Sequence, residues 1–125
     1  MKKVFSVLTL VVLLMVGMSS PTSAAGTFTE YYSMDYVTVY SPSGYADVQI
    51  QNYSEEGGNF HFVIYEAGTE KVLYEVTSYI PGKTAAGPAT QNYTWITKTN
   101  SRVNTDMAIF RDNESVEPTF FVDGQ

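Results

Sequence analysis

Short segments in which apolar and polar residues alternate make up most of this chain and constrain its fold more than any other feature. The clearest of them runs from Tyr45 to Tyr53, where Ala46, Val48 and Ile50 occupy alternate positions. Successive side chains of a strand point to opposite faces, so this pattern predicts a strand with one apolar and one polar face. We find no run with helical apolar spacing. The alternation therefore predicts an all-β fold.

Turn residues rich in glycine, proline, serine and asparagine separate these segments. We predict tight turns at residues 41–44 and 67–69, a hairpin-like loop at residues 55–59, a long crossing loop at residues 80–90, and a polar loop at residues 99–105. The remaining segments give seven or eight short strands. They are residues 27–32 and 34–40 (one bent strand or two), 45–53, 60–65, 71–79, 91–98, 106–111 and 119–122.

This number and spacing of strands predicts a single antiparallel β-sandwich domain over residues 26–125, immunoglobulin-like or with Greek-key connections. A long connection such as residues 80–90 is what a Greek key needs to change sheets. A small closed β-barrel is the alternative.

The first 25 residues have the layout of a secretory signal peptide. Lys2 and Lys3 precede an uncharged apolar run from Val4 to Met18, and small residues follow up to Ala25. The apolar run is short for a membrane span, so we expect cleavage near Ala25 and no membrane span afterwards. We therefore expect a secreted, extracellular protein.

Charge and cysteine content narrow the setting further. The leader holds two of the seven basic residues and none of the thirteen acidic ones, so the remaining residues carry a net charge of −8. Such an acidic surface repels phosphate groups, which argues against nucleic acid and anionic membranes as partners. The chain has no cysteine. Small animal secreted domains usually depend on disulfides, so a bacterial source is favoured.

Tyrosine is the most informative residue type for function, because the chain has ten of them and several fall on polar strand faces. We expect a second strand carrying Tyr36 and Tyr40 to lie beside the strand of residues 45–53. Aromatic rings beside amide and carboxylate groups suit a sugar, and they equally suit a protein interface. The predicted ligand face consists of Tyr36, Tyr40, Tyr45, Asp47, Gln49, Gln51 and Tyr53.

Two further residues are secondary candidates. Trp95 is the only tryptophan; its place in a central strand favours a core position over a binding role. Arg102 lies in the expected polar loop, where a guanidinium could bind a carboxylate of a ligand. Pairing of Arg102 with the nearby Asp106 is the simpler expectation.

Catalytic and metal-binding patterns are weak. His61 is the only histidine, and it lies in an expected strand on the side opposite Phe60 and Phe62. No cysteine nucleophile, nucleophile-elbow motif or two-histidine zinc motif is present. We therefore expect no enzymatic activity and no cofactor. Calcium is the one metal to consider, although the spacing of a calcium loop is missing; the acidic residues concerned are Asp106, Asp112, Glu114, Glu117 and Asp123.

These observations favour a small, non-catalytic secreted protein that binds an extracellular glycan or protein through its tyrosine-bearing face. A secreted toxin or enzyme inhibitor is one alternative. A structural component of an extracellular layer is another, and it would self-associate through an exposed sheet edge or a tyrosine face.

Overall fold

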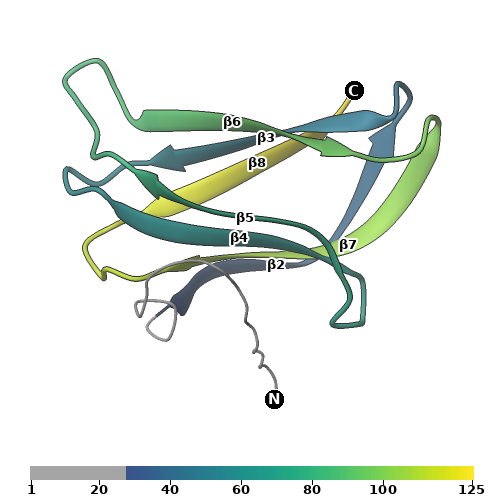
Figure 1. The fold of residues 1–125 in the computed structure, drawn as a ribbon, viewed down its shortest axis with the longest axis horizontal. Coiled ribbons are helices and arrows are strands. Elements are labelled where there is room, and N and C mark those ends of the chain that lie inside the picture. The colour runs from purple at the N-terminus through teal and green to yellow at the C-terminus, as the bar shows by residue number, and fades with distance from the viewer. Residues whose placement is uncertain (1–27) are drawn as a thin grey trace.

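The computed structural model describes residues 28–125, which form seven strands and no helix (Figure 1). The predicted all-β class is therefore confirmed. The leader and its cleavage site, residues 1–25, lie outside the described residues. Within the described residues, no helix is long and apolar enough to span a membrane. The strands are β2 (Thr29–Ser41), β3 (Tyr45–Asn52), β4 (Gly58–Glu66), β5 (Val72–Ile80), β6 (Ala89–Ile96), β7 (Ser101–Arg111) and β8 (Pro118–Gly124).

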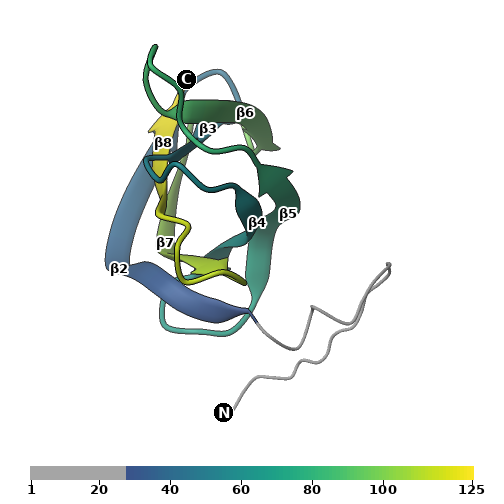
Figure 2. The same ribbon diagram turned by 90° about the vertical axis from the view of Figure 1, so that its left-hand side faces the viewer.

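The strands form two antiparallel sheets that face each other as two layers (Figure 2). The large sheet has the order β2-β7-β4-β5, and the small sheet has the order β6-β3-β8. The β-sandwich prediction is thus confirmed. The closed barrel is wrong, because the strands divide into two separately hydrogen-bonded sheets. Of the two alternatives for residues 27–40, one bent strand or two short ones, the structure has the single strand β2, with two register shifts against β7.

The chain changes sheet at every connection between these strands except the one between β4 and β5. That connection is the predicted tight turn at residues 67–69, where Gly68 has a φ of 76°. The long loop at residues 80–90 crosses between sheets as predicted. The expected hairpin at residues 55–59 is wrong, because it leads from β3 to β4 in the other sheet. Glycine and acidic residues mark a change of chain direction and carry no information on which sheet receives the next strand.

The predicted polar loop at residues 99–105 is also wrong, because β7 already begins at Ser101. Arg102 and Asn104 point outward from β7, whereas the alternate residues Val103 and Thr105 face the core side. The Thr38 hydroxyl of β2 donates a 2.8 Å hydrogen bond to the side-chain oxygen of Asn104. The polar residues therefore form the outward face of a strand, which the alternation alone does not distinguish from a polar loop.

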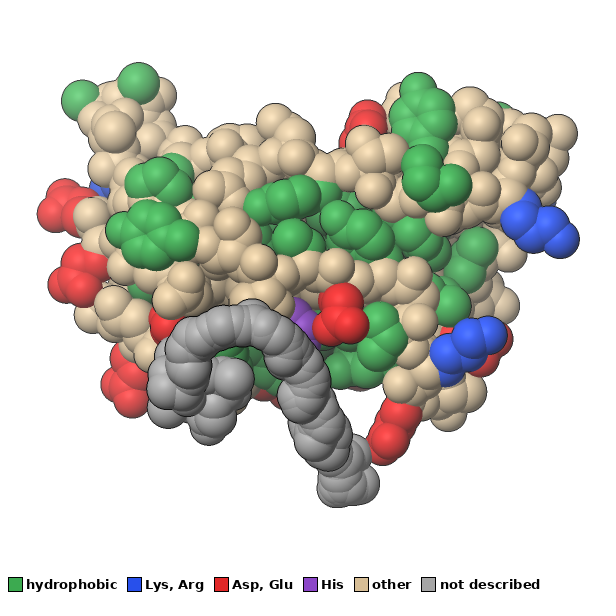
Figure 3. Space-filling view, viewed as in Figure 1, with side chains coloured by type: hydrophobic (Ala, Val, Ile, Leu, Met, Phe, Trp, Pro, Cys, Tyr) green, Lys and Arg blue, Asp and Glu red, His purple; other side chains and the backbone are tan. Residues whose placement is uncertain are grey.

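The core lies between the two sheets and consists of the apolar faces predicted from the alternation. Ala46, Val48 and Ile50 of β3 are completely buried. The rings of Phe62 on β4 and Phe120 on β8 lie 4.9 Å apart between centroids and join the two sheets. Apolar side chains show along the middle of Figure 3, between the sheets. Burying these faces supplies the main stabilisation of the sandwich.

At one end of the sandwich, a single buried amide forms hydrogen bonds with three loops. Asn52, the last residue of β3, has no exposed surface. Its Nδ2 donates to the backbone carbonyl oxygens of Glu56 and Pro81, each at 2.9 Å. Its Oδ1 accepts from the backbone N–H groups of Ser54, at 3.0 Å, and Glu117, at 3.2 Å. Asn52 therefore connects the β3–β4, β5–β6 and β7–β8 loops and uses its full hydrogen-bonding capacity.

Candidate functional site

The β3 part of the predicted ligand face lies on one side of the small sheet. Tyr45, Asp47 and Tyr53 are exposed, and Gln49 and Gln51 are half-buried. The alternate residues of β3 face the core. The outward direction of these five side chains follows from the same alternation that builds the core.

The expected contribution of Tyr36 and Tyr40 to this face is wrong. Both residues belong to β2, which pairs with β7 in the large sheet and does not pair with β3. Tyr36 is 61% exposed and lies at a register shift of β2. Alternation assigns a side chain to a face of its own strand, but it does not identify the neighbouring strands.

The two secondary candidates also lie elsewhere. Trp95 is only 5% exposed and is part of the core, opposite Ala46. Arg102 lies in β7, and its guanidinium carbon is 4.4 Å from the centroid of the Tyr40 ring. Arg102 forms no ion pair with Asp106, and the Asp106 carboxylate instead accepts a 2.9 Å hydrogen bond from the Gly68 N–H. Neither Trp95 nor Arg102 therefore lies on the outward side of the small sheet with the β3 residues.

The actual neighbours of β3 are β6 and β8, and they add residues to this surface that the sequence pattern does not place there. Phe121 of β8 is opposite Gln49 and is 53% exposed. Asp123 is opposite Asp47 on the same strand pair, and Asn92 of β6 is opposite Gln49. A signal for Phe121 exists in the sequence: two consecutive phenylalanines in one strand must point to opposite faces, so one of them faces outward.

We call this surface the small-sheet face, and it consists of Tyr45, Asp47, Gln49, Gln51, Tyr53, Asn92, Thr94, Phe121 and Asp123.

A row of side-chain hydrogen bonds runs along the small-sheet face. The Tyr53 hydroxyl donates to Gln51 Oε1, Gln51 Nε2 donates to Gln49 Oε1 at 3.2 Å, and Gln49 Nε2 donates to Asn92 Oδ1 at 3.3 Å. These bonds fix the orientation of three neighbouring amides before any ligand arrives. A pre-ordered row of polar groups loses less side-chain entropy on binding than a mobile one.

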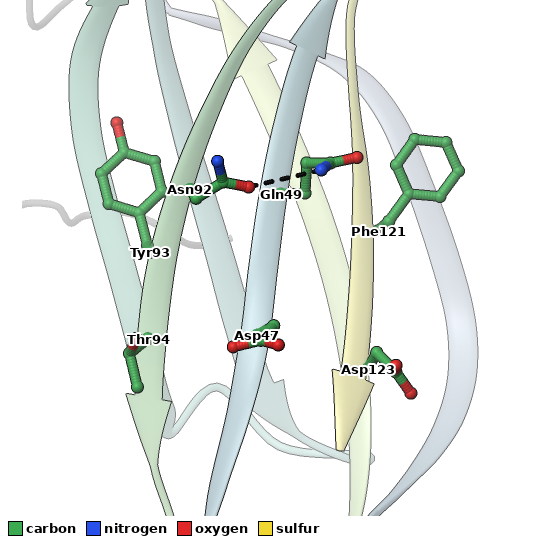
Figure 4. Close-up of a pocket in the computed structure, with 7 residues that line it drawn as sticks. All are labelled: Asp47, Gln49, Asn92, Tyr93, Thr94, Phe121 and Asp123. Carbon is green, nitrogen blue, oxygen red and sulfur yellow. Dashed lines mark hydrogen bonds between the residues drawn. The ribbon is translucent and has the colours of Figure 1, made fainter. Parts of the chain in front are cut away.

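An open cavity of about 460 Å³ lies beside this row, and Figure 4 shows the side chains that line it. The Phe121 ring stands at one side, and the carboxylates of Asp47 and Asp123 lie on adjacent strands. Like charges directly opposite each other weaken a sheet, so this pair contributes nothing to the stability of the sheet. Asp123 accepts a 3.2 Å hydrogen bond from Gln125, whereas Asp47 has no ion-pair partner in residues 28–125.

His61 lies on the other side of the molecule, on the outward face of the large sheet. As predicted, it points away from the side of the buried Phe60 and Phe62. Its Nε2 is 2.9 Å from Glu75 Oε1, and the ring of Phe110 lies 5.7 Å away between centroids. The hydrogen bond with His61 lowers the pKa of the Glu75 carboxyl, although partial burial opposes this effect.

Replacement of Glu75 by glutamine tests this contact. Because the pKa of Glu75 is lower in the folded than in the unfolded chain, its stabilisation is complete above its ordinary pKa. It is lost as the pH falls through the lower, folded value. Glu75 is 55% exposed, so we expect Glu75→Gln to cost less than about 1 kcal/mol at neutral pH. Urea unfolding at neutral and strongly acidic pH measures this. A difference between the two proteins that grows on acidification would contradict the assignment.

The acidic residues considered for calcium do not come together. Among residues 28–125, no group of three or more histidine, cysteine, aspartate or glutamate side chains could hold a metal ion. Asp112 instead accepts hydrogen bonds from the backbone and side-chain nitrogens of Asn59, at 3.1 and 2.8 Å. The carboxylate of Asp123 lies on the small-sheet face.

The small-sheet face therefore combines one exposed phenyl ring, a row of oriented amides and two carboxylates around an open cavity. Comparison of the whole chain with known proteins adds no precedent for this arrangement: the chain matches no family model, no curated protein and no solved structure.

Proposed function

We propose that this chain is a non-catalytic, secreted protein, of bacterial source, that binds carbohydrate through the small-sheet face. The proposal depends on one observation above all: the exposed Phe121 ring stands on one side of the oriented Gln49 amide, and the Asn92 amide stands on the other. A flat ring packs against the C–H face of a sugar, while amides and carboxylates exchange hydrogen bonds with its hydroxyl groups.

The chemistry of this face favours a sugar over a protein partner. The centre of a protein interface is depleted in charged residues. Here Asp47 and Asp123 lie within the cavity lining, and the polar groups are interspersed with single rings. Carboxylates are strong acceptors for sugar hydroxyls. No observation in residues 28–125 favours a toxin, an enzyme inhibitor or a component of an extracellular layer over this function.

The location outside the cell follows from the leader-like first 25 residues. The absence of cysteine from all 125 residues supports a bacterial source. These two parts of the proposal rest on the sequence, and detection of the processed protein in the culture medium of its source tests the first of them.

Phe121→Ala is the direct test of the binding face. We expect the purified protein to bind one or more carbohydrates on a glycan array, and calorimetry then gives the dissociation constant. Loss of the ring should weaken binding at least about tenfold, which corresponds to about 1.4 kcal/mol. The matched control is Tyr36→Ala, which removes a comparably exposed ring from the large sheet. Equal effects of both substitutions, or no binding to any array carbohydrate, would refute the proposal.

A further inference from the structure

A second cavity adjoins the small-sheet face at the end of the sandwich closed by Asn52. It has a volume of about 800 Å³ and lies between the β3–β4 and β5–β6 loops. Figure 1 shows the β5–β6 loop projecting beyond the ends of the sheets. The residues that line this cavity are Tyr53, Glu55, Lys83, Thr84, Ala85, Gly87 and Pro88.

Tyr53 connects the two cavities. Its ring lines the second cavity, and its hydroxyl hydrogen-bonds to Gln51 at the end of the amide row. Gln51 in turn donates a hydrogen bond to Gln49, which lines the first cavity. A strand rises about 3.4 Å per residue, so the path from Asp47 to Tyr53 is about 20 Å long. One sugar unit cannot reach both cavities, whereas a chain of several units can.

The loops around the second cavity are fixed by backbone contacts. The N–H of Lys83 donates a 2.7 Å hydrogen bond to the Ser54 carbonyl oxygen. Gly82 lies so close to the β3–β4 loop that an added Cβ would be 2.0 Å from the Glu55 carbonyl oxygen. Thr84 and Gly87 exchange two backbone hydrogen bonds, at 2.9 and 3.0 Å. The cavity is therefore pre-formed, as binding sites for small molecules usually are.

From this geometry we infer that the ligand is a linear, non-anionic polysaccharide that lies along β3 and occupies both cavities. The inference rests on the proposed function and names its substrate class. Charge excludes polymers of uronic acids, because their carboxylates would lie against Asp47 and Asp123. The rings of Phe121 and Tyr53 would each pack against a sugar unit, one in each cavity.

Calorimetry with disaccharides and hexasaccharides tests the inference. The probes are β-1,4-linked glucose and β-1,4-linked N-acetylglucosamine series, together with the array carbohydrates that bind. Joining two subsites on one ligand raises affinity without any new kind of contact, so each hexasaccharide that binds should do so at least about tenfold more tightly than its disaccharide. Hexagalacturonate should not bind.

Variants separate the two cavities. Tyr53→Ala should remove the advantage of the longer ligand, so that the hexasaccharide and the disaccharide bind this variant with nearly equal affinity. Phe121→Ala should weaken both, and Tyr36→Ala should change neither. Equal affinities for short and long ligands, or strong binding of hexagalacturonate, would overturn the inference while leaving carbohydrate binding intact. Absence of binding to these series and to every array carbohydrate would overturn the proposed function as well.

Discussion

Asn52→Ala should lower the free energy of unfolding by about 3 kcal/mol or more, because each buried hydrogen-bonding group left without a partner costs about 1 to 3 kcal/mol. Asn52 is completely buried and makes four hydrogen bonds to three loops. Alanine would leave two carbonyl oxygens and two N–H groups to find new partners or water. Urea unfolding of the purified variants measures the loss.

Asn92→Ala is the matched control. Asn92 is exposed and accepts one side-chain hydrogen bond, from Gln49 at 3.3 Å. An exposed substitution of this kind usually changes stability by no more than about 0.5 kcal/mol. Asn52→Asp supplies a second comparison. It should also lower the free energy of unfolding, because a carboxylate oxygen would face the carbonyl oxygens of Glu56 and Pro81 in place of a donor. A cost for Asn52→Ala no larger than that of the control would show that the amide does not hold the loops together.

Phe62→Ala should cost about 3 to 5 kcal/mol, because it removes a completely buried ring and leaves a cavity between the sheets. Phe62 contacts Phe120 of the small sheet, and its ring centroid also lies 6.5 Å from that of Tyr74 on β5. The loss therefore affects the packing of both sheets. Urea or thermal unfolding of the purified variant measures it.

Phe121→Ala is the control for this core substitution as well as the test of the binding face. Phe121 is 53% exposed, although its neighbour in sequence, Phe120, is 7% exposed. Removing the outward ring should cost less than about 1 kcal/mol, so the two phenylalanine substitutions should differ several-fold in their effect on stability. Similar losses for Phe62→Ala and Phe121→Ala would show that the two sheets are not packed as described.

The alternation of apolar and polar residues was sufficient to predict the fold class and the direction of most side chains in β3. Ala46, Val48 and Ile50 are buried as predicted, and Tyr45 and Asp47 are exposed. The same rule extends to Asn52, which follows Ile50 by two positions and faces inward. An asparagine at the end of a strand suggests an exposed residue, but its place in the alternation of β3 predicts the buried position in which Asn52 bonds to the three loops.

The neighbours of each strand could not be predicted, and the candidate site depends on them. Tyr36 and Tyr40 lie in the other sheet, whereas Phe121 and Asn92 stand beside Gln49. Strand pairing is decided by how two whole sheets pack against each other, and no local pattern encodes it. The sequence alone therefore does not show that the phenyl ring, the amide row and the carboxylate pair lie on one surface; the strand order shows it.

The strand order also dictates how much of the chain must be present before a stable domain can form. Thr29 of β2 pairs with Arg111 of β7, and β3 pairs with β8, the last of the described strands. Only β4 and β5 are joined by a short turn within one sheet. Domains dominated by such distant pairings fold slowly, on a scale of about milliseconds to seconds. During synthesis, β3 lacks one of its two partners until Pro118–Gly124 has left the ribosome, so the small sheet cannot be completed before that point.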